Sequence, residues 1–359
     1  MSHRFLGALA AGVMAALLAP APVAAQPGLV AVEKAAAALA PKGWTVPRTP
    51  DGQPDLQGVW TNGFITPVER PAELAGKPFF TKQEAVAFEQ HKVINRDDRG
   101  KLDGESDVKF AYNDAWWDFG THVSKTLQTS LVVDPPDGKI PPLTPEAQKR
   151  VAMRLQAIAE KCSQPGAICL DATNGDGVPL PTDGPEDRSY MERCISWGQA
   201  GPPMMPSGYN NNYQIVQNAN NVLIFVESMH EARVIPLDGR PHLPPDVRQL
   251  MGDPRGHWEG NTLVVDSTNF SDATKFRNAG RNMHLIERFT RTDPDTLLYE
   301  YTLDDPTTFT KPWSVAIPMA ATKDKIFEYE CNEGNVGLAG ILRGARFAEK
   351  QAAKAGASK

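Results

Sequence analysis

Residues 256–270 read Gly-His-Trp-Glu-Gly-Asn-Thr-Leu-Val-Val-Asp-Ser-Thr-Asn-Phe, and this stretch decides the fold that we expect. Its second half, from residue 262, is rich in the β-branched and apolar residues that favour strands. Further β-type runs follow near 283–291, 296–304, 311–319 and 325–331, separated by Gly, Asp-Pro or charged turns. Short runs joined by turns predict an antiparallel meander.

Alternation along these runs assigns their side chains to faces, because successive residues of a strand point to opposite sides. Each run has one predominantly apolar face, which must be buried. A closed or half-closed β-barrel buries such faces without leaving long strand edges, so we expect a mainly β fold of this kind. The residues that share a face are Met283, Leu285, Glu287, Phe289 and Arg291 in one run, Leu297, Tyr299, Tyr301 and Leu303 in the next, and Trp313, Val315, Ile317 and Met319 after it.

Two G-x-W triplets extend this interpretation, one at Gly58-Val-Trp60 and one at Gly256-His-Trp258. The triplet resembles the G-x-W of lipocalin-like (calycin-type) barrels. In that family the glycine lets the chain turn tightly and the tryptophan plugs one end of the barrel. The resemblance implies that Trp258 lies inward.

Longer motifs support a second resemblance, which covers the chain after its leader. They are Tyr209-Asn-Asn-Asn-Tyr-Gln, His230-Glu-Ala-Arg, Trp258-Glu-Gly-Asn-Thr-Leu-Val-Val and Tyr329-Glu-Cys-Asn-Glu-Gly-Asn335. Together they resemble a widespread, uncharacterised family of exported bacterial proteins. That resemblance implies export and implies no particular activity.

The rest of the chain predicts long Pro/Gly-rich loops and a few helices, because its 31 prolines and 29 glycines fall mostly between short β-type runs. One helix is expected over 144–161, where Thr144 caps and Pro145 fits the first turn. Another begins at Thr81, which forms a capping box with Glu84. Two more are expected after Pro244-Pro245 and near 338–353. We therefore divide the chain into a signal peptide (1–25), an irregular β-rich region with helices packed on the barrel (26–250), the meander (251–346) and a frayed tail (347–359).

The N-terminus has the features of a secretory signal: Arg4, an apolar run over 5–19, and the small residues Val23-Ala24-Ala25. We expect cleavage after Ala25 and a periplasmic or secreted protein without a membrane span, since no later stretch approaches the roughly 20 apolar residues that a span requires. The net charge of −6 and the lack of a Lys/Arg block argue against a nucleic-acid partner. The sequence does not indicate an oligomeric state.

Four cysteines follow the leader, and in an oxidising compartment an even number favours disulfides. Cys162 and Cys169 enclose a short turn-bearing loop that can close on itself. Cys194 and Cys331 then form a long-range bridge. The alternatives are free thiols or a zinc site, and the second is disfavoured because no C-x-x-C spacing exists.

The familiar catalytic and nucleotide-binding signatures are absent from the sequence, including G-x-S-x-G, H-E-x-x-H and both Gly-rich phosphate loops. Residues 171–177 are similar to a calcium loop, but Thr182 stands where a bidentate Glu is needed. We therefore expect neither a metal nor a cofactor, and a small molecule as the partner.

Three charged residues are the candidate site on the barrel strands. Alternation places Glu287 and Arg291 on an inward face, where a charge needs a partner. They form either a buried ion pair that fixes the register or an anchor for a ligand oxygen. Asp266, on a neighbouring strand, poses the same choice.

His230 is the candidate proton shuttle. It shares a face with small residues if its strand continues, or lies at a barrel mouth if residues 229–232 form a turn; a structural role is the alternative. Arg233, Asp238, Arg240 and His242 crowd the next turn, as either a solvated salt-bridge cluster or, for Arg233, part of a ligand site.

Aromatic residues with polar tips suggest a pocket, since they can stack on a ring and still form a hydrogen bond. They can also simply fill a core. Two functions follow: a binding protein that holds an apolar, oxygen-bearing molecule in the barrel, or an acid–base enzyme (hydro-lyase, isomerase or hydrolase) that uses His230, Glu287 and Asp266. The aromatic residues are Trp116, Trp117, Tyr209, Tyr213, Trp258, Tyr299, Tyr301 and Trp313.

Overall fold

The computed structural model describes residues 26–97, 118, 120–171, 178–198, 200–274 and 276–357. The predicted signal peptide, residues 172–177 of the calcium-like loop, and Trp116 and Trp117 lie outside the described residues.

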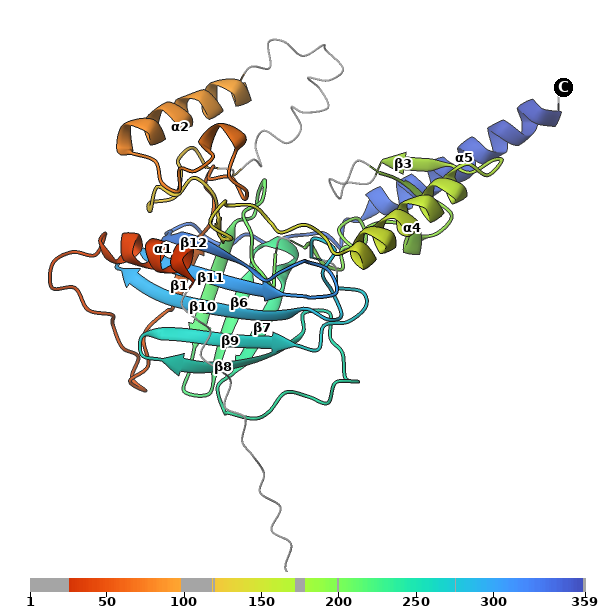
Figure 1. The fold of residues 1–359 in the computed structure, drawn as a ribbon. Coiled ribbons are helices and arrows are strands. Elements are labelled where there is room, and N and C mark those ends of the chain that lie inside the picture. The colour runs from red at the N-terminus through yellow and green to blue at the C-terminus, as the bar shows by residue number, and fades with distance from the viewer. Residues whose placement is uncertain are drawn as a thin grey trace, which may run out of the picture.

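The main element is one antiparallel sheet that curves into a nearly closed barrel (Figure 1). This confirms the mainly β, barrel-type fold. The strands follow the order β7-β6-β5-β1-β12-β11-β10-β9-β8, and the short β2 also pairs with β12. Their bounds are β1 (Gly58–Thr61), β2 (Val132–Asp134), β5 (Asn212–Gln217), β6 (Asn221–Val226), β7 (Ala232–Pro236), β8 (Asp253–Glu259), β9 (Thr262–Thr268), β10 (His284–Asp293), β11 (Thr296–Asp304) and β12 (Trp313–Ala321).

The two end strands, β7 and β8, meet at Gly256. A Cβ atom at this position would lie 2.6 Å from a Leu237 methyl carbon and 2.8 Å from an Ile235 methyl carbon. Real Cβ atoms do not approach other atoms so closely, so any other residue here would force the Leu237 and Ile235 side chains to shift. Gly256 therefore eases the close approach of β8 to β7 and does not serve a turn.

The barrel includes strands from both sides of residue 250, which corrects the predicted division of the chain. Strands β8 to β12 form the expected meander, and β1, β5, β6 and β7 complete the wall. The join is made by β1, which pairs with β12 through Trp60 and Ala321 and with β5 through Trp60 and Tyr213. The region before 250 is thus part of the barrel and is not merely packed against it.

The helices lie outside the barrel and confirm two capping predictions. Thr144 accepts a hydrogen bond from the Ala147 N–H at the start of α4, and Thr81 and Glu84 form the expected capping box at α2. In Figure 1, α1 lies against the barrel, whereas α4, β3 and α5 project away from it. The bounds are α1 (Pro27–Ala37), η1 (Ala72–Leu74), α2 (Lys82–Asp97), α4 (Pro145–Cys162), β3 (Cys169–Asp171), β4 (Pro179–Pro181), η3 (Pro185–Asp187), η4 (Ser228–His230) and α5 (Val336–Ala357).

Three local predictions were wrong. No helix follows Pro244-Pro245, and no strand forms over 325–331. The C-terminal helix α5 continues to Ala357, through residues that we expected to fray. Over 325–331, Phe327, Tyr329 and Cys331 alternate with Glu328 and Glu330, yet this strand-like pattern does not produce a strand, so local pattern alone is a poor guide.

Both predicted disulfides are confirmed. Cys162 and Cys169 are bonded, with 5.7 Å between their Cα atoms, and Cys194 is bonded to Cys331, with 5.6 Å between theirs. The second bridge closes a separation of 137 residues and ties the middle of the chain to the segment before α5. Two bridges are compatible with an extracytoplasmic protein. Within the described part of the chain, no helix is long and apolar enough to span a membrane.

Candidate functional site

The barrel interior contains a buried ion pair between Arg233 of β7 and Glu287 of β10. Arg233 Nη1 donates to Glu287 Oε1 at 2.9 Å, and Nη2 also contacts the carboxylate. The Glu287 side chain is 0% exposed and that of Arg233 is 6% exposed. Tyr299 Oη donates to Glu287 Oε1 at 2.8 Å, and Arg233 Nη2 donates to Ser267 Oγ at 3.1 Å. Four side chains from four strands thus form one polar network.

This pairing corrects the expected one. Glu287 faces inward as predicted, but its partner is Arg233 and not Arg291. Arg291 lies at the end of β10, where its guanidinium sits 5.4 Å from the centre of the Trp60 ring and donates to the carbonyl of Asp55 at 3.2 Å. The prediction that Arg233 belongs to a solvated cluster was therefore wrong, and its inclusion among candidate ligand-binding residues stays a prediction.

Burial and the Glu287 charge together set the pKa directions of Arg233 and Tyr299. Burial alone would lower the pKa of the Arg233 guanidinium, but Glu287 outweighs it and raises that pKa. Burial and the nearby Glu287 carboxylate also raise the pKa of the Tyr299 hydroxyl well above its usual value. Arg233 therefore stays charged and Tyr299 stays a hydrogen-bond donor at physiological pH.

Donor capacity is left over in this interior. The Nε–H of Arg233 and the indole N–H of Trp313 are buried without a hydrogen-bond acceptor. A buried donor without an acceptor is costly, and a charged one more so. These two atoms are where an oxygen-bearing molecule could form new hydrogen bonds.

The predicted aromatic lining is inward. Tyr213, Tyr299, Tyr301 and Trp313 all belong to the main core cluster, whereas Trp258 is only partly buried against it. These side chains pack on one another, with 5.8 Å between the ring centres of Tyr301 and Trp313. Of the two G-x-W tryptophans, Trp60 is the fully buried one, and its indole N–H donates to the carbonyl of Leu56.

A short segment with two methionines, Met204 and Met205, enters the same interior. The Met204 N–H donates to Tyr299 Oη at 3.1 Å, and Tyr301 Oη lies 3.1 Å from Met205 Sδ. Both methionines are buried in the core cluster. No pattern in the sequence predicts this insertion.

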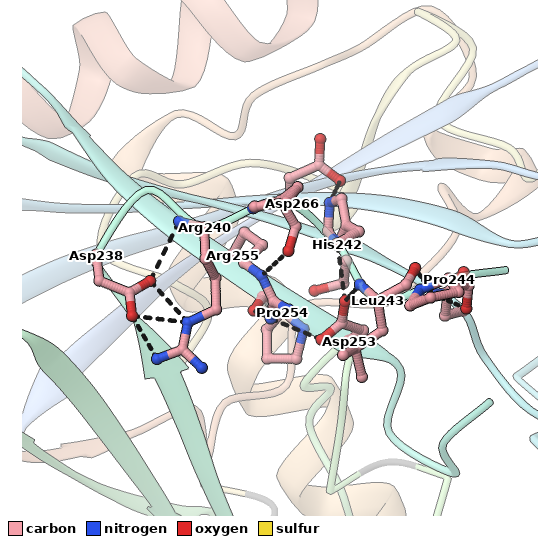
Figure 2. Close-up of polar contacts among 12 residues, drawn as sticks. Asp238, Arg240, His242, Leu243, Pro244, Asp253, Pro254, Arg255 and Asp266 are labelled. Carbon is pink, nitrogen blue, oxygen red and sulfur yellow. Dashed lines mark hydrogen bonds and ion pairs between the residues drawn. The ribbon is translucent and has the colours of Figure 1, made fainter. Parts of the chain in front are cut away.

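A second polar cluster lies on the outer face of the barrel, and Figure 2 shows the His242 ring between two carboxylates. His242 Nδ1 is 3.1 Å from Asp253 Oδ2, and its Nε2 is 3.3 Å from Asp266 Oδ1. His284 Nε2 lies 2.9 Å from the same Asp266 oxygen. Asp266 therefore faces outward, which corrects the predicted inward position.

The four residues Asp253, His242, Asp266 and His284, here called the outer relay, alternate carboxylate and imidazole. Partial burial would raise the pKa of the Asp266 carboxyl, but His284 and His242 outweigh it and lower that pKa. The hydrogen bond to Asp266 raises the pKa of His284. Asp253 is buried and held by the Leu243 N–H and by Arg255. The outer relay therefore joins two carboxylates and two imidazoles in one continuous set of polar contacts.

His230 lies in a turn, as one of the two alternatives predicted, and it contacts main chain. Its Nε2 is 2.7 Å from the Tyr329 N–H and 3.0 Å from the Phe327 carbonyl, and its ring stacks on Phe225. Nearby, buried Glu227 accepts a hydrogen bond from the Phe327 N–H, and burial raises its pKa. These contacts secure the segment before α5.

The three predicted catalytic residues thus occupy separate environments. His230 holds main chain, Glu287 binds Arg233 inside the barrel, and Asp266 binds two histidines outside it. Sequence reasoning missed His242 as a relay member, together with Asp253 and His284. Asp238 and Arg240 form the exposed ion pair that we expected.

In the described ranges, no group of three or more His, Cys, Asp or Glu side chains is arranged to hold a metal ion. Comparison with known proteins adds no assignment, because no family model, no curated protein and no solved structure matches the chain.

Proposed function

We propose that this is an exported, periplasmic or secreted protein that binds an apolar, oxygen-bearing small molecule inside its barrel. The observation that carries the proposal is the Arg233 guanidinium, which is buried, charged and left with an Nε–H that has no acceptor. A ligand carbonyl or carboxylate oxygen would satisfy this donor. Small-molecule sites commonly combine apolar walls with a few such polar groups.

The walls around Arg233 favour a ligand with a hydrocarbon or ring body. Tyr299, Tyr301 and Trp313 offer aromatic surface, which stacks well on other rings. Binding requires Met204 and Met205 to withdraw, since they pack against the tyrosines. Methionine adapts readily because its side chain is unbranched and flexible. Export is supported by the two disulfides.

Native mass spectrometry of the exported protein, followed by binding of the fluorescent fatty acid cis-parinaric acid, tests this function. We expect a copurifying small molecule, and energy transfer from the barrel tryptophans to bound parinaric acid. Tyr299→Phe, which keeps the ring and removes one hydroxyl, should weaken binding. Arg291→Met is the matched control, because Arg291 lies outside the interior network, and it should bind normally.

Two results would reject the barrel site. One is the absence of both a copurifying molecule and parinaric acid binding. The other is binding that is equally weakened by Tyr299→Phe and Arg291→Met, because the network would then have no special role.

The outer relay favours a second candidate function, acid–base catalysis. Asp253 orients His242 through Nδ1, as a general base requires, but Asp266 occupies the Nε2 side. Hydrolysis of p-nitrophenyl acetate tests for a reactive imidazole. Activity that is lost in His242→Asn would support the enzyme, and activity that is absent or unchanged would reject it.

A further inference from the structure

A hollow of about 690 Å³ lies outside the barrel, between the first turns of α4 and two loops at the barrel end. The loops are 272–282, which joins β9 to β10, and 305–308, which joins β11 to β12. We call this hollow the α4 groove. Its volume falls within the range of small-molecule sites, which is roughly 300–1,000 Å³.

The floor of the α4 groove is built around Asp305, which is buried. Its carboxylate accepts hydrogen bonds from the Thr307 N–H at 3.0 Å, the Thr307 hydroxyl at 2.7 Å, the Thr308 hydroxyl at 2.9 Å and the Gly280 N–H at 3.4 Å. These four hydrogen bonds occupy the oxygens of the Asp305 carboxylate and hold the floor in one arrangement. Asp305 therefore has little capacity left to pair with the arginines of the groove.

The arginines that line the groove differ in whether a carboxylate pairs with them. Arg281 is paired with Asp272 at 2.6 Å. Arg150 donates only to neutral acceptors, the Thr307 carbonyl at 2.9 Å and the Thr308 hydroxyl at 3.3 Å. Arg154 has neither a hydrogen bond nor an ion pair with any described residue. The groove is lined by three arginines and three carboxylates, and the two arginines without a carboxylate partner among the described residues, Arg150 and Arg154, are exposed and lie on α4.

Arg150 and Arg154 lie four residues apart on α4, and both line the groove. Residues at this spacing are neighbours on one helix face. Guanidinium groups bind carboxylates in a planar, bidentate geometry that a single lysine cannot reproduce. Two lining carboxylates have no ion pair among the described residues: Asp305, which is bonded to neutral donors of the floor, and Glu146, one turn before Arg150. Both limit how much negative charge the groove accepts.

We propose that the α4 groove is a second binding site, which takes a small carboxylate-bearing molecule. Arg150 and Arg154 hold the carboxylate. Thr274 and Asn282 also line the groove, but the Thr274 hydroxyl already donates to the Leu250 carbonyl at 2.6 Å, and the Asn282 amide donates to the Thr307 hydroxyl at 3.3 Å. The site goes beyond the proposed barrel function, because it lies on a different part of the molecule and uses none of the residues of the interior network.

Isothermal titration with succinate, and with its neutral analogue succinamide, tests the proposal. The informative variant is Arg154→Glu, because Arg154 makes no contact on which folding depends. Lys149→Glu is the matched control: it makes the same charge change on the same exposed helix, at a position that does not line the groove.

We expect wild-type protein to bind succinate more tightly than succinamide. Arg154→Glu should weaken succinate binding at least about tenfold, since charge-assisted hydrogen bonds are replaced by repulsion, and Lys149→Glu should bind as wild type does. Lack of succinate binding to the wild type would overturn the site, as would equal weakening in the two variants. Parinaric acid binding should be unchanged in Arg154→Glu, so failure here and failure of the barrel site are distinguishable.

Discussion

Breaking the Arg233–Glu287 pair should show whether a fully buried charge pair holds this barrel together. Glu287→Gln leaves the Arg233 guanidinium in the interior without a counter-charge, and the side chain is 6% exposed, so water cannot cover it. Removing one partner of a buried pair typically costs about 3–5 kcal/mol. We therefore expect Glu287→Gln to lower the free energy of unfolding by that amount.

The converse change, Arg233→Met, should be less costly and should depend on pH. A guanidinium cannot lose its proton in a protein, whereas a carboxylate that is left alone can take one up. The cost of Arg233→Met should therefore shrink as pH is lowered from about 7 to about 5, while the cost of Glu287→Gln should not. This asymmetry distinguishes an orphaned charge from a simple loss of packing.

The double variant Arg233→Met, Glu287→Leu removes both charges together. Replacing a buried pair by apolar residues is often neutral or stabilising. Here the Tyr299 hydroxyl loses its acceptor, which costs about 1–3 kcal/mol. We expect the double variant to be more stable than Glu287→Gln and within about 2 kcal/mol of the wild type.

Urea denaturation with both disulfides intact, followed by tryptophan fluorescence at several pH values, measures these differences. The reasoning is refuted if both single variants cost less than about 1 kcal/mol at pH 7, the value typical of exposed pairs. It is also refuted if the double variant costs the sum of the two single ones, because the partners would then not interact.

Three further outcomes are expected. Replacing both cysteines of the Cys194–Cys331 bridge by serine should destabilise the protein by about 5 kcal/mol, against about 2–3 kcal/mol for the shorter bridge, because a closed loop of 137 residues restricts the unfolded chain more than one of 7; similar losses in denaturation curves would contradict this. The raised pKa of His284 contributes stability at pH values below the pKa of the unfolded state, and this contribution is lost as pH rises through the pKa of the folded state. His284→Gln should therefore lower the free energy of unfolding by less than about 1 kcal/mol near pH 5.5 and should leave it unchanged near pH 9. An effect that does not depend on pH would contradict this. Burial raises the pKa of Glu300 to about 8, so the wild type loses stability as pH rises from 4.5 towards 8, and Glu300→Gln should be more stable by roughly 3 kcal/mol at pH 7 and by little at pH 4; an equal effect at both pH values would show that burial does not shift the group.

Alternation in the sequence predicted the inward faces of the meander because that rule depends only on neighbours along one strand. Tyr299 and Tyr301, on β11, and Trp313, on β12, lie inside as expected. Arg291 also keeps its register, opposite Leu297, and lies over the ring of the buried Trp60. Its expected contact with Glu287 failed because four residues separate the two along an extended strand, which is too far for an ion pair.

The partner of Glu287 could not be found by local pattern. Arg233 lies 54 residues earlier in the chain, on β7, and meets Glu287 only because the sheet curves into a barrel. The same limitation hid the outer relay, which joins a loop histidine to carboxylates on β8 and β9. Asp266 was predicted to face inward because it shares a strand face with the apolar Val264. That face is the outer one, and Val264 is nevertheless buried there.

The polar groups of this protein divide into those whose hydrogen-bonding capacity is used by the chain and those with capacity left. His230 and Glu227 belong to the first class, since both are bonded to main chain of the segment at 327–329. Arg233 and Arg154 belong to the second: Arg233 has a buried Nε–H without an acceptor, and Arg154, which is exposed, has no partner among the described residues. Both are permanently charged donors, which suit recognition of an oxygen anion better than proton transfer at neutral pH. The unused capacity of the molecule therefore favours binding over acid–base catalysis.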